Sequence, residues 1–213
     1  EWGCFAEDVG IDLYEVIEAI RMRPTHSNIR QPGFGVGGYC LTKDPLFAKI
    51  AANDILDITG HKFPFSTQAV KINTEMPLIT LNKLKHYFKS DLNGKKILLM
   101  GVTYRQDVGD TRFSPSEIFV NEARSQGAEV SAHDPLVDHW DETDMEIRRE
   151  LPDSGDFDAI VFAVPHREFA EISLNEWIRL NDTLIFDANN VLTKKQVSDI
   201  MANKLNYLSV GRG

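Results

Sequence analysis

Cysteine and long hydrophobic runs are scarce in this sequence. The 213 residues include two cysteines, Cys4 and Cys40, too few for a disulfide framework, so we expect reduced thiols and a cytoplasmic location. No apolar run approaches the roughly 20 residues that cross a membrane as a helix. The first residues do not have the pattern of a secretory signal. These absences argue against a disulfide-rich secreted protein and against a membrane protein.

Basic residues are in the minority. Lys and Arg number 23 against 32 Asp and Glu, and the formal net charge is −9. A nucleic-acid-binding protein needs a basic face, so we expect no nucleic-acid partner, although a few local cations can still hold a small anion. Histidines and acids do not stand at metal-ligand spacings, so we expect no metal. The acidic run 138–150 is predicted to be solvated surface.

The first 92 residues predict a helical region. Apolar residues recur at helical spacing from Trp2 to Ile20. We expect Gly10 to break this run and Asp12 to cap a second helix. Cys4, on an apolar face of the first helix, is predicted to be a core residue. Another helix should begin near Pro45. A longer one is expected over 66–89, kinked or divided by Pro77.

The pattern changes at residues 93–94, and the remainder alternates between strands and helices. Short apolar runs predict strands over 96–101, 129–133, 159–164, 183–186 and 206–210, and helices over 114–127, 168–180 and 193–202. Such alternation predicts an α/β fold, a Rossmann-like parallel sheet of about five strands with helices on both faces. We therefore expect two domains, 1–92 and 93–213. Ligands of such sheets bind at the carboxyl ends of the strands.

A glycine-rich segment precedes Cys40, with the sequence PGFGVGGYCLTKDP over residues 32–45. Four glycines in six residues allow a backbone to approach a ligand closely. Gly33, Gly35 and Gly38 have the G-x-G-x-x-G spacing of a dinucleotide fingerprint, but no buried strand precedes them. We therefore favour a backbone cradle for an oxygen-rich ligand.

The residues that follow the glycines suggest covalent catalysis by Cys40. Lys43 and the loop amides could lower the pKa of its thiol. If a helix starts at or before Cys40, Asp44 lies one turn along and could act as a base on water that attacks a thioester. Alternatively, Asp44 caps the helix at Pro45, and the two roles can coexist.

A second polar segment, 101–115, lies between the first predicted strand and its helix, where nucleotide phosphates commonly bind. Tyr104 could stack on a base or sugar, and Arg105 or Arg112 could pair with phosphate. The alternative is a solvated loop with a structural pair between Asp110 and Arg112. Further along, 166–167 are expected in a loop near the same crevice.

These two segments, in this order, resemble the UDP-glucose/GDP-mannose dehydrogenase family. Residues 32–44 are similar to that family's catalytic cysteine loop, and 101–115 to its nucleotide-sugar-binding signature. Members oxidise the C6 hydroxyl of a nucleotide sugar to a carboxylate, with NAD as oxidant. The resemblance implies that Cys40 traps the C6 aldehyde as a thiohemiacetal, that a thioester follows, and that Asp44 handles water and protons beside Lys43.

The resemblance also implies the binding residues. Those expected to bind the UDP-sugar are Arg30, Gly33, Phe34, Gly35, Gly37, Gly38, Tyr104 and Arg105. Arg112 is expected to contact NAD. Val36 resembles the residue found in members that use N-acetylhexosamine nucleotides, whereas Lys43-Asp44 resembles the pair found in members that use UDP-glucose. We slightly favour a UDP-N-acetylhexosamine as the substrate. A homodimer is expected, because the predicted helices 1–21 and 66–89 carry much apolar surface.

Two departures from the family pattern limit the prediction. The family's NAD fingerprint domain would precede Glu1, so we expect this chain to be the end of the central region plus the C-terminal domain of a longer protein. Many members have an arginine after the aspartate that corresponds to Asp187, where this sequence has Ala188-Asn189. The alternatives are a UDP-sugar-binding and dimerisation module without activity, or a cysteine acyl-transfer enzyme, although nothing in the sequence places His61 near the thiol.

Overall fold

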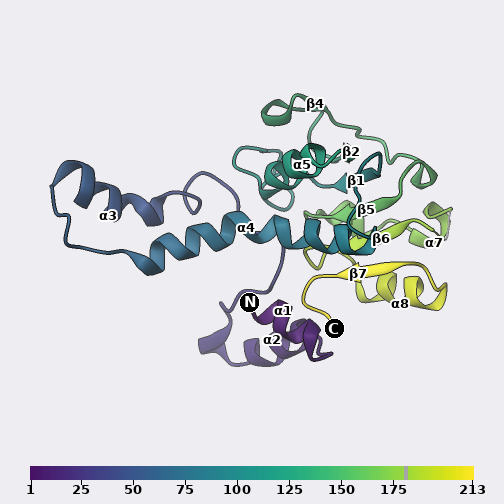
Figure 1. Cartoon of the computed structure of the whole chain (residues 1–213). Helices are drawn as coiled ribbons and strands as arrows, with labels where there is room; N and C mark the ends of the chain where they lie inside the picture. Colours follow the sequence, from purple (N-terminus) through teal and green to yellow (C-terminus); the bar gives the residue numbers. More distant parts are fainter. Residues whose placement is uncertain (180–181) are drawn as a thin grey trace.

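The computed structural model describes residues 1–179 and 182–213, and a five-stranded parallel sheet lies at its centre (Figure 1). The strand order is β2-β1-β5-β6-β7. The strands are β1 (Lys96–Met100), β2 (Glu129–His133), β5 (Ala159–Phe162), β6 (Leu184–Asp187) and β7 (Tyr207–Ser209). All four neighbouring pairs are parallel. The predicted α/β sheet is confirmed, because continuous apolar runs such as 97–100 are buried on both faces.

Helices cover both faces of this sheet. Ile97 and Leu99 face a core that includes α4 (Pro64–Tyr87) and α5 (Pro115–Ser125). Leu98 and Met100 face a second core, which includes α6 (Arg167–Ala170), α7 (Leu174–Trp177) and α8 (Lys194–Ala202). The last turn of α4 thus packs against the sheet. The division of the chain into the domains 1–92 and 93–213 stays a prediction.

The single helix predicted over 168–180 is wrong: two short helices, α6 and α7, stand in its place. The side chain of Gln196 supplies the reason. Its Nε2 donates to the carbonyls of Phe169 (2.8 Å) and Ile172 (3.0 Å), which a continuous helix would bond internally. The predicted end of that helix, at Leu180, lies outside the described residues.

The acidic run 138–150 contains a small antiparallel pair that the sequence analysis missed. Strands β3 (His139–Trp140) and β4 (Met145–Glu146) pair with each other. Trp140 is fully buried and Met145 nearly so, so the prediction of a wholly solvated surface is wrong. The charged residues of the run face solvent, and the apolar residues between them cover one edge of the first core.

The N-terminal helices α1 (Trp2–Asp8) and α2 (Leu13–Arg21) pack against the last residues of the chain. Asp12 caps α2 by accepting from the Tyr14 N–H, as predicted. Glu7 accepts from the Gly211 N–H (2.6 Å), and the Arg212 guanidinium donates to Asp12 (3.0 Å). Cys4 is exposed, contrary to the prediction, because α1 buries only its small residues Gly3 and Ala6.

An extended arm leads away from the sheet (Figure 1). It consists of the 3₁₀ turn Asp44–Leu46, α3 (Phe47–Ile50), the π-helical turn Ala51–Ile55 and the first half of α4. Pro77 does not divide α4, a continuous helix of 24 residues that contains it. The arm exposes large apolar side chains, Phe65 to 86%. Among the described residues, no helix is both long and apolar enough to span a bilayer.

Candidate active site

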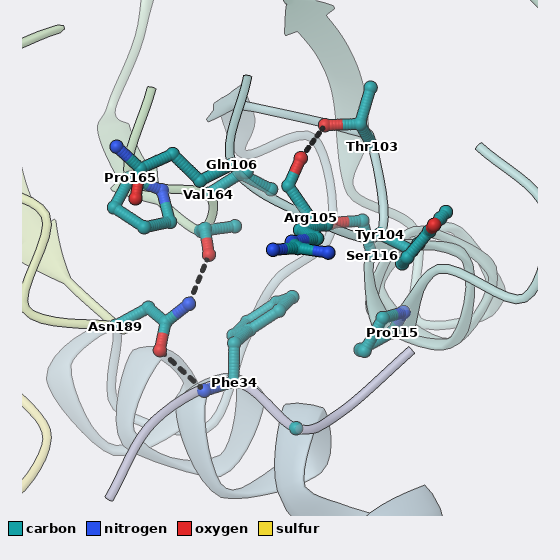
Figure 2. Close-up of a pocket in the computed structure, with 12 residues that line it drawn as sticks. Phe34, Thr103, Tyr104, Arg105, Gln106, Pro115, Ser116, Val164, Pro165 and Asn189 are labelled. Atoms are coloured by element: carbon teal, nitrogen blue, oxygen red, sulfur yellow. Dashed lines mark hydrogen bonds between the residues drawn. The ribbon is translucent and has the colours of Figure 1, made fainter. Parts of the chain in front are cut away.

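A pocket lies at the carboxyl ends of β1 and β5 (Figure 2). Its volume is about 180 Å³, less than the 300–1,000 Å³ typical of a pocket that encloses a drug-sized ligand. Five segments contribute to its lining: Phe34-Gly35, Thr103–Gln106, Pro115-Ser116, Ala163–Pro165 and Asn189. The structure therefore brings the start of the glycine-rich segment to the strand ends, beside the polar segment 101–115.

Asn189 joins the glycine-rich segment to the sheet. Its Nδ2 donates to the Ala163 carbonyl (2.8 Å), and its Oδ1 accepts from the Phe34 N–H (3.4 Å), as Figure 2 shows. A Cβ atom on Gly33 would stand 2.1 Å from that same Oδ1, so a larger residue there would displace the Asn189 side chain. Its position directly after a buried strand, at the carboxyl end of the sheet, is the sequence signal for a site residue.

Glycines 37 and 38 make room for neighbouring protein groups. A Cβ atom on Gly37 would lie 2.7 Å from the Phe113 carbonyl oxygen. Gly38 has a φ of +88°, and its Cβ would meet the Tyr104 ring at 3.0 Å. The Gly38 N–H also donates to the Phe113 carbonyl (3.2 Å). The two predicted loops thus interlock directly, and the glycines serve this contact between loops.

Asn73, on α4, fixes the middle of the glycine-rich segment. Its side chain bonds both the N–H and the carbonyl of Val36. A Cβ atom on Gly35 would lie 3.2 Å from the Asn73 carbonyl oxygen, so the segment packs closely on the backbone of α4. The helix therefore holds the segment through the side chain of Asn73, which sequence reasoning missed.

Cys40 is exposed, and its carbonyl accepts from the Asp44 N–H (2.9 Å), so the two residues are one turn apart. The Asp44 carboxylate pairs with Lys43 (2.8 Å), and the 3₁₀ turn begins at Asp44 itself, with Lys43 in the N-cap position. The hydrogen bond to Asp44 raises the pKa of the Lys43 ammonium above its ordinary value. Cys40, Lys43 and Asp44 are not among the residues that line the pocket of Figure 2.

The predicted arginines divide into paired and unpaired groups. Arg112 forms a two-pronged pair with Asp110, at 2.9 and 2.7 Å, which lowers the pKa of that carboxyl, so the structural pair is confirmed. Arg105 lines the pocket, and Arg30 lines a neighbouring hollow beside Gly33 and Gly35. Neither guanidinium forms an ion pair with the described part of the chain. Both are therefore available to an anionic ligand.

The described residues, 1–179 and 182–213, can be compared with the requirements of a metal site and of an NAD site. No group of three His, Cys, Asp or Glu side chains within them could hold a metal ion. The G-x-G-x-x-G spacing follows the 3₁₀ turn Pro24–His26 and precedes the turn at Cys40, so it does not form a strand–turn–helix dinucleotide site. The described residues do not fit NAD in this way.

Two models of one family match this chain. The central domain of the UDP-glucose/GDP-mannose dehydrogenase family matches residues 1–75, and the UDP binding domain of the same family matches residues 98–194. The two segments that suggested the family on sequence grounds fall one in each match.

Proteins similar to this chain come from several organisms. The UDP-N-acetyl-D-mannosamine dehydrogenase of Methanocaldococcus jannaschii is 30% identical over 92% of the chain and 43% of its own length. The UDP-glucose 6-dehydrogenase of Rickettsia bellii is 26% identical over 99% and 49%. The solved UDP-D-ManNAc dehydrogenase of Pyrococcus horikoshii superposes with a TM-score of 0.73 at 27% identity, covering 100% and 47%.

The chain spans about half the length of the curated relatives it matches. Its sheet, its helical N-terminal region and both matched domains agree with one assignment. The chain belongs to the UDP-glucose/GDP-mannose dehydrogenase family, a family of oxidoreductases that act on nucleotide sugars.

Proposed function

We propose that this chain is part of an NAD-dependent UDP-sugar 6-dehydrogenase, which oxidises the C6 hydroxyl to the uronate through a Cys40 thiohemiacetal and thioester. The contact between Gly38 and Tyr104 carries the proposal. It joins the loop with the thiol to the loop beside the pocket, so a ligand held by the second loop extends toward the first. UDP-N-acetylhexosamine is the favoured substrate, with UDP-glucose as the alternative.

The pocket of Figure 2 would hold the nucleotide part of this substrate. Phe34 gives it an apolar wall, and the unpaired Arg105 supplies a cation for the diphosphate. Arg30 offers a second cation on the far side of Gly33 and Gly35. A volume of about 180 Å³ leaves the sugar outside the pocket, where it can reach the exposed thiol.

Cys40 and Asp44 would then act in sequence. The thiol adds to the C6 aldehyde: a carbon–sulfur bond forms, and the thiol proton passes to the carbonyl oxygen. After oxidation to a thioester, water attacks the carbonyl while the Asp44 carboxylate accepts its proton, and the thiolate leaves. NAD would accept the hydrides, and because the described residues form no strand–turn–helix dinucleotide site, we assign them no hydride-transfer step. Arg112 remains a proposed NAD contact once its pair with Asp110 opens.

The same proposal includes a homodimer in the cytoplasm. Large apolar side chains are exposed on α1 and on the arm, Trp2 to 75% and Phe65 to 86%, and monomers rarely expose extended apolar patches. Both cysteines are unpaired, as in a reducing compartment. Sedimentation of the protein as a monomer at assay concentration would contradict the dimer.

The decisive experiment compares Cys40→Ala with Cys4→Ala, because both thiols are exposed. The protein carrying this sequence is given NAD and either UDP-N-acetylmannosamine or UDP-glucose, and the uronate is measured. Cys40→Ala should lose uronate formation by at least about 100-fold, since no second nucleophile replaces the thiol, and Cys4→Ala should keep it. Uronate formation by Cys40→Ala at the unsubstituted rate would overturn the covalent role.

A second function, a UDP-sugar-binding and dimerisation module without activity, is favoured by one observation. Cys40, Lys43 and Asp44 stand apart from the lining of the pocket. Calorimetry with UDP together with the NAD assay separates the two functions. UDP binding without NADH formation by any UDP-sugar would support the module, and UDP binding with NADH formation would support the dehydrogenase.

A further inference from the structure

His166 is buried at the edge of the pocket, its side chain exposed to only 1%. It precedes α6, and its ring contacts both ends of the loop that carries Tyr104 and Arg105. Nε2 lies 3.1 Å from the Thr103 hydroxyl at the start of the loop. Nδ1 accepts from the Asp107 N–H at the end of it, also at 3.1 Å.

The partners of the ring fix its tautomer. A backbone N–H can only donate, so Nδ1 carries no proton. The hydrogen is therefore on Nε2, which donates to the Asp134 carboxylate at 3.1 Å. Asp134 is fully buried and also accepts from the Val102 and Leu136 N–H groups, both at 2.9 Å. The Asp134 carboxylate, which directly follows β2, thus holds the His166 ring in its Nε2–H tautomer.

The loop needs such an anchor because its backbone is irregular. Asp107 has a φ of +55°, a left-handed conformation that non-glycine residues adopt at a cost. The Thr103 hydroxyl also donates to the Arg105 carbonyl (3.1 Å; Figure 2). The Asp107 carboxylate accepts from the Arg167 N–H (3.1 Å). His166 therefore connects the two turns between which the Arg105 side chain reaches the pocket.

We propose that His166 is a positioning residue for nucleotide binding: its Nε2–H tautomer, held between Asp134 and Asp107, sets the place of Arg105 against the diphosphate. The inference rests on the proposed function and deepens it. In this role His166 touches no ligand and acts through Arg105. A residue of merely structural importance would lower stability without changing what Arg105 contributes.

The test is a double-mutant cycle on UDP affinity. Calorimetry gives the UDP dissociation constant of the whole protein for His166→Gln, Arg105→Ala and the double variant. His166→Gln should weaken binding about tenfold, the worth of one hydrogen-bonded contact to a charged group, and should add little in the Arg105→Ala background. Additive effects, or unchanged affinity in His166→Gln, would overturn the proposal.

Two companion variants keep the result interpretable. Thr103→Val removes the hydroxyl beside His166 Nε2 by a change of nearly equal shape. If His166→Gln folds poorly, Thr103→Val takes its place in the cycle and should weaken UDP binding in the same non-additive way. His133→Asn is the matched control, because His133 packs on Phe169 as His166 does but does not bond the loop. Equal weakening by the control would overturn the proposal.

Nitrogen NMR separates this inference from the proposed function. The His166 ring should show the neutral Nε2–H tautomer, and the Asp107 amide should shift in His166→Gln. If the unsubstituted protein does not bind UDP, the proposed function fails, and the tautomer and the amide shift still decide whether His166 holds the loop. The other tautomer, or an unmoved Asp107 amide, would refute that hold.

Discussion

The side-chain amide of Asn73 forms both of its hydrogen bonds with the backbone of one residue, Val36. Nδ2 donates to the Val36 carbonyl (2.7 Å), and Oδ1 accepts from the Val36 N–H (2.8 Å). An amide is the side chain that matches a donor and an acceptor at once. Helix α4 therefore holds the glycine-rich segment as a neighbouring strand would.

Replacement of this amide should loosen the segment. Asn73→Ala loses two hydrogen bonds, each worth about 0.5–1.5 kcal/mol net. We expect amide exchange at Val36 to accelerate by about tenfold, the equivalent of 1.4 kcal/mol. Hydrogen exchange of the folded protein measures it. Asn82→Ala on the same helix is the control, because Asn82 is exposed; equal acceleration there would contradict the clamp.

Gly37 should be intolerant of a methyl group, although no positive φ demands glycine there. A Cβ atom would meet the Phe113 carbonyl oxygen at 2.7 Å and Pro115 Cδ at 2.8 Å. Gly37→Ala should lower the free energy of unfolding by about 1–3 kcal/mol, as overpacking does. Gly60→Ala, with open space around it, should stay within about 0.5 kcal/mol. Urea unfolding compares them, and a neutral Gly37→Ala would show that the loops do not interlock.

Asp44→Asn should reduce turnover while UDP affinity stays unchanged. Loss of a general base costs about 10²–10⁴-fold in rate, and Asp44 is not among the residues that line the pocket. Single-turnover assays should show the thioester accumulating. Asp54→Asn on the exposed arm controls for charge. Normal turnover in Asp44→Asn would assign proton transfer elsewhere.

His133 should make the fold sensitive to mild acid. Burial lowers the pKa of its imidazole below the ordinary value, although the hydrogen bond to the Arg148 carbonyl opposes this. The unfolded chain then binds a proton first, so stability should fall as the pH drops below about 6.5. His133→Asn should lose part of this slope in urea titrations at several pH values. An unchanged slope would assign the acid sensitivity to other groups.

Arg212 should contribute more to stability than an exposed arginine. Its guanidinium donates to Asp12, to the Tyr207 hydroxyl (3.1 Å) and to Asn190 (2.6 Å). Arg212→Met should cost about 2–4 kcal/mol, because three partly buried polar partners lose a charged donor. Arg179→Met, which breaks an exposed pair with Asp153, should cost less than about 1 kcal/mol. Equal losses in thermal unfolding would contradict this difference.

The sheet could be predicted from the sequence because its signals are local. The run 97–100 is apolar throughout, as a strand buried on both faces requires. The helix cap at Asp12 is equally local. The break at 171–173 was not predictable, since it depends on the amide of Gln196, which lies more than twenty residues later in the sequence.

The candidate site was predictable as a set of segments, whereas its geometry was not. Spacing indicated the glycines before Cys40, but it did not show that Gly37 and Gly38 face Phe113 and Tyr104. Exposure of Cys4 was likewise hidden, because periodicity marks an apolar face without telling what covers it. Contacts between distant segments decide both outcomes.

The attachment of α1 and α2 to residues 207–213 has a consequence for the order of folding. The Glu7–Gly211 and Asp12–Arg212 contacts join positions 204 and 200 residues apart. Contacts that close so long a loop form late, because the entropy of closure is lost before the contact rewards it. On the ribosome, α1 and α2 can make these contacts only after the whole sheet has been synthesised, so their attachment is among the last steps of folding.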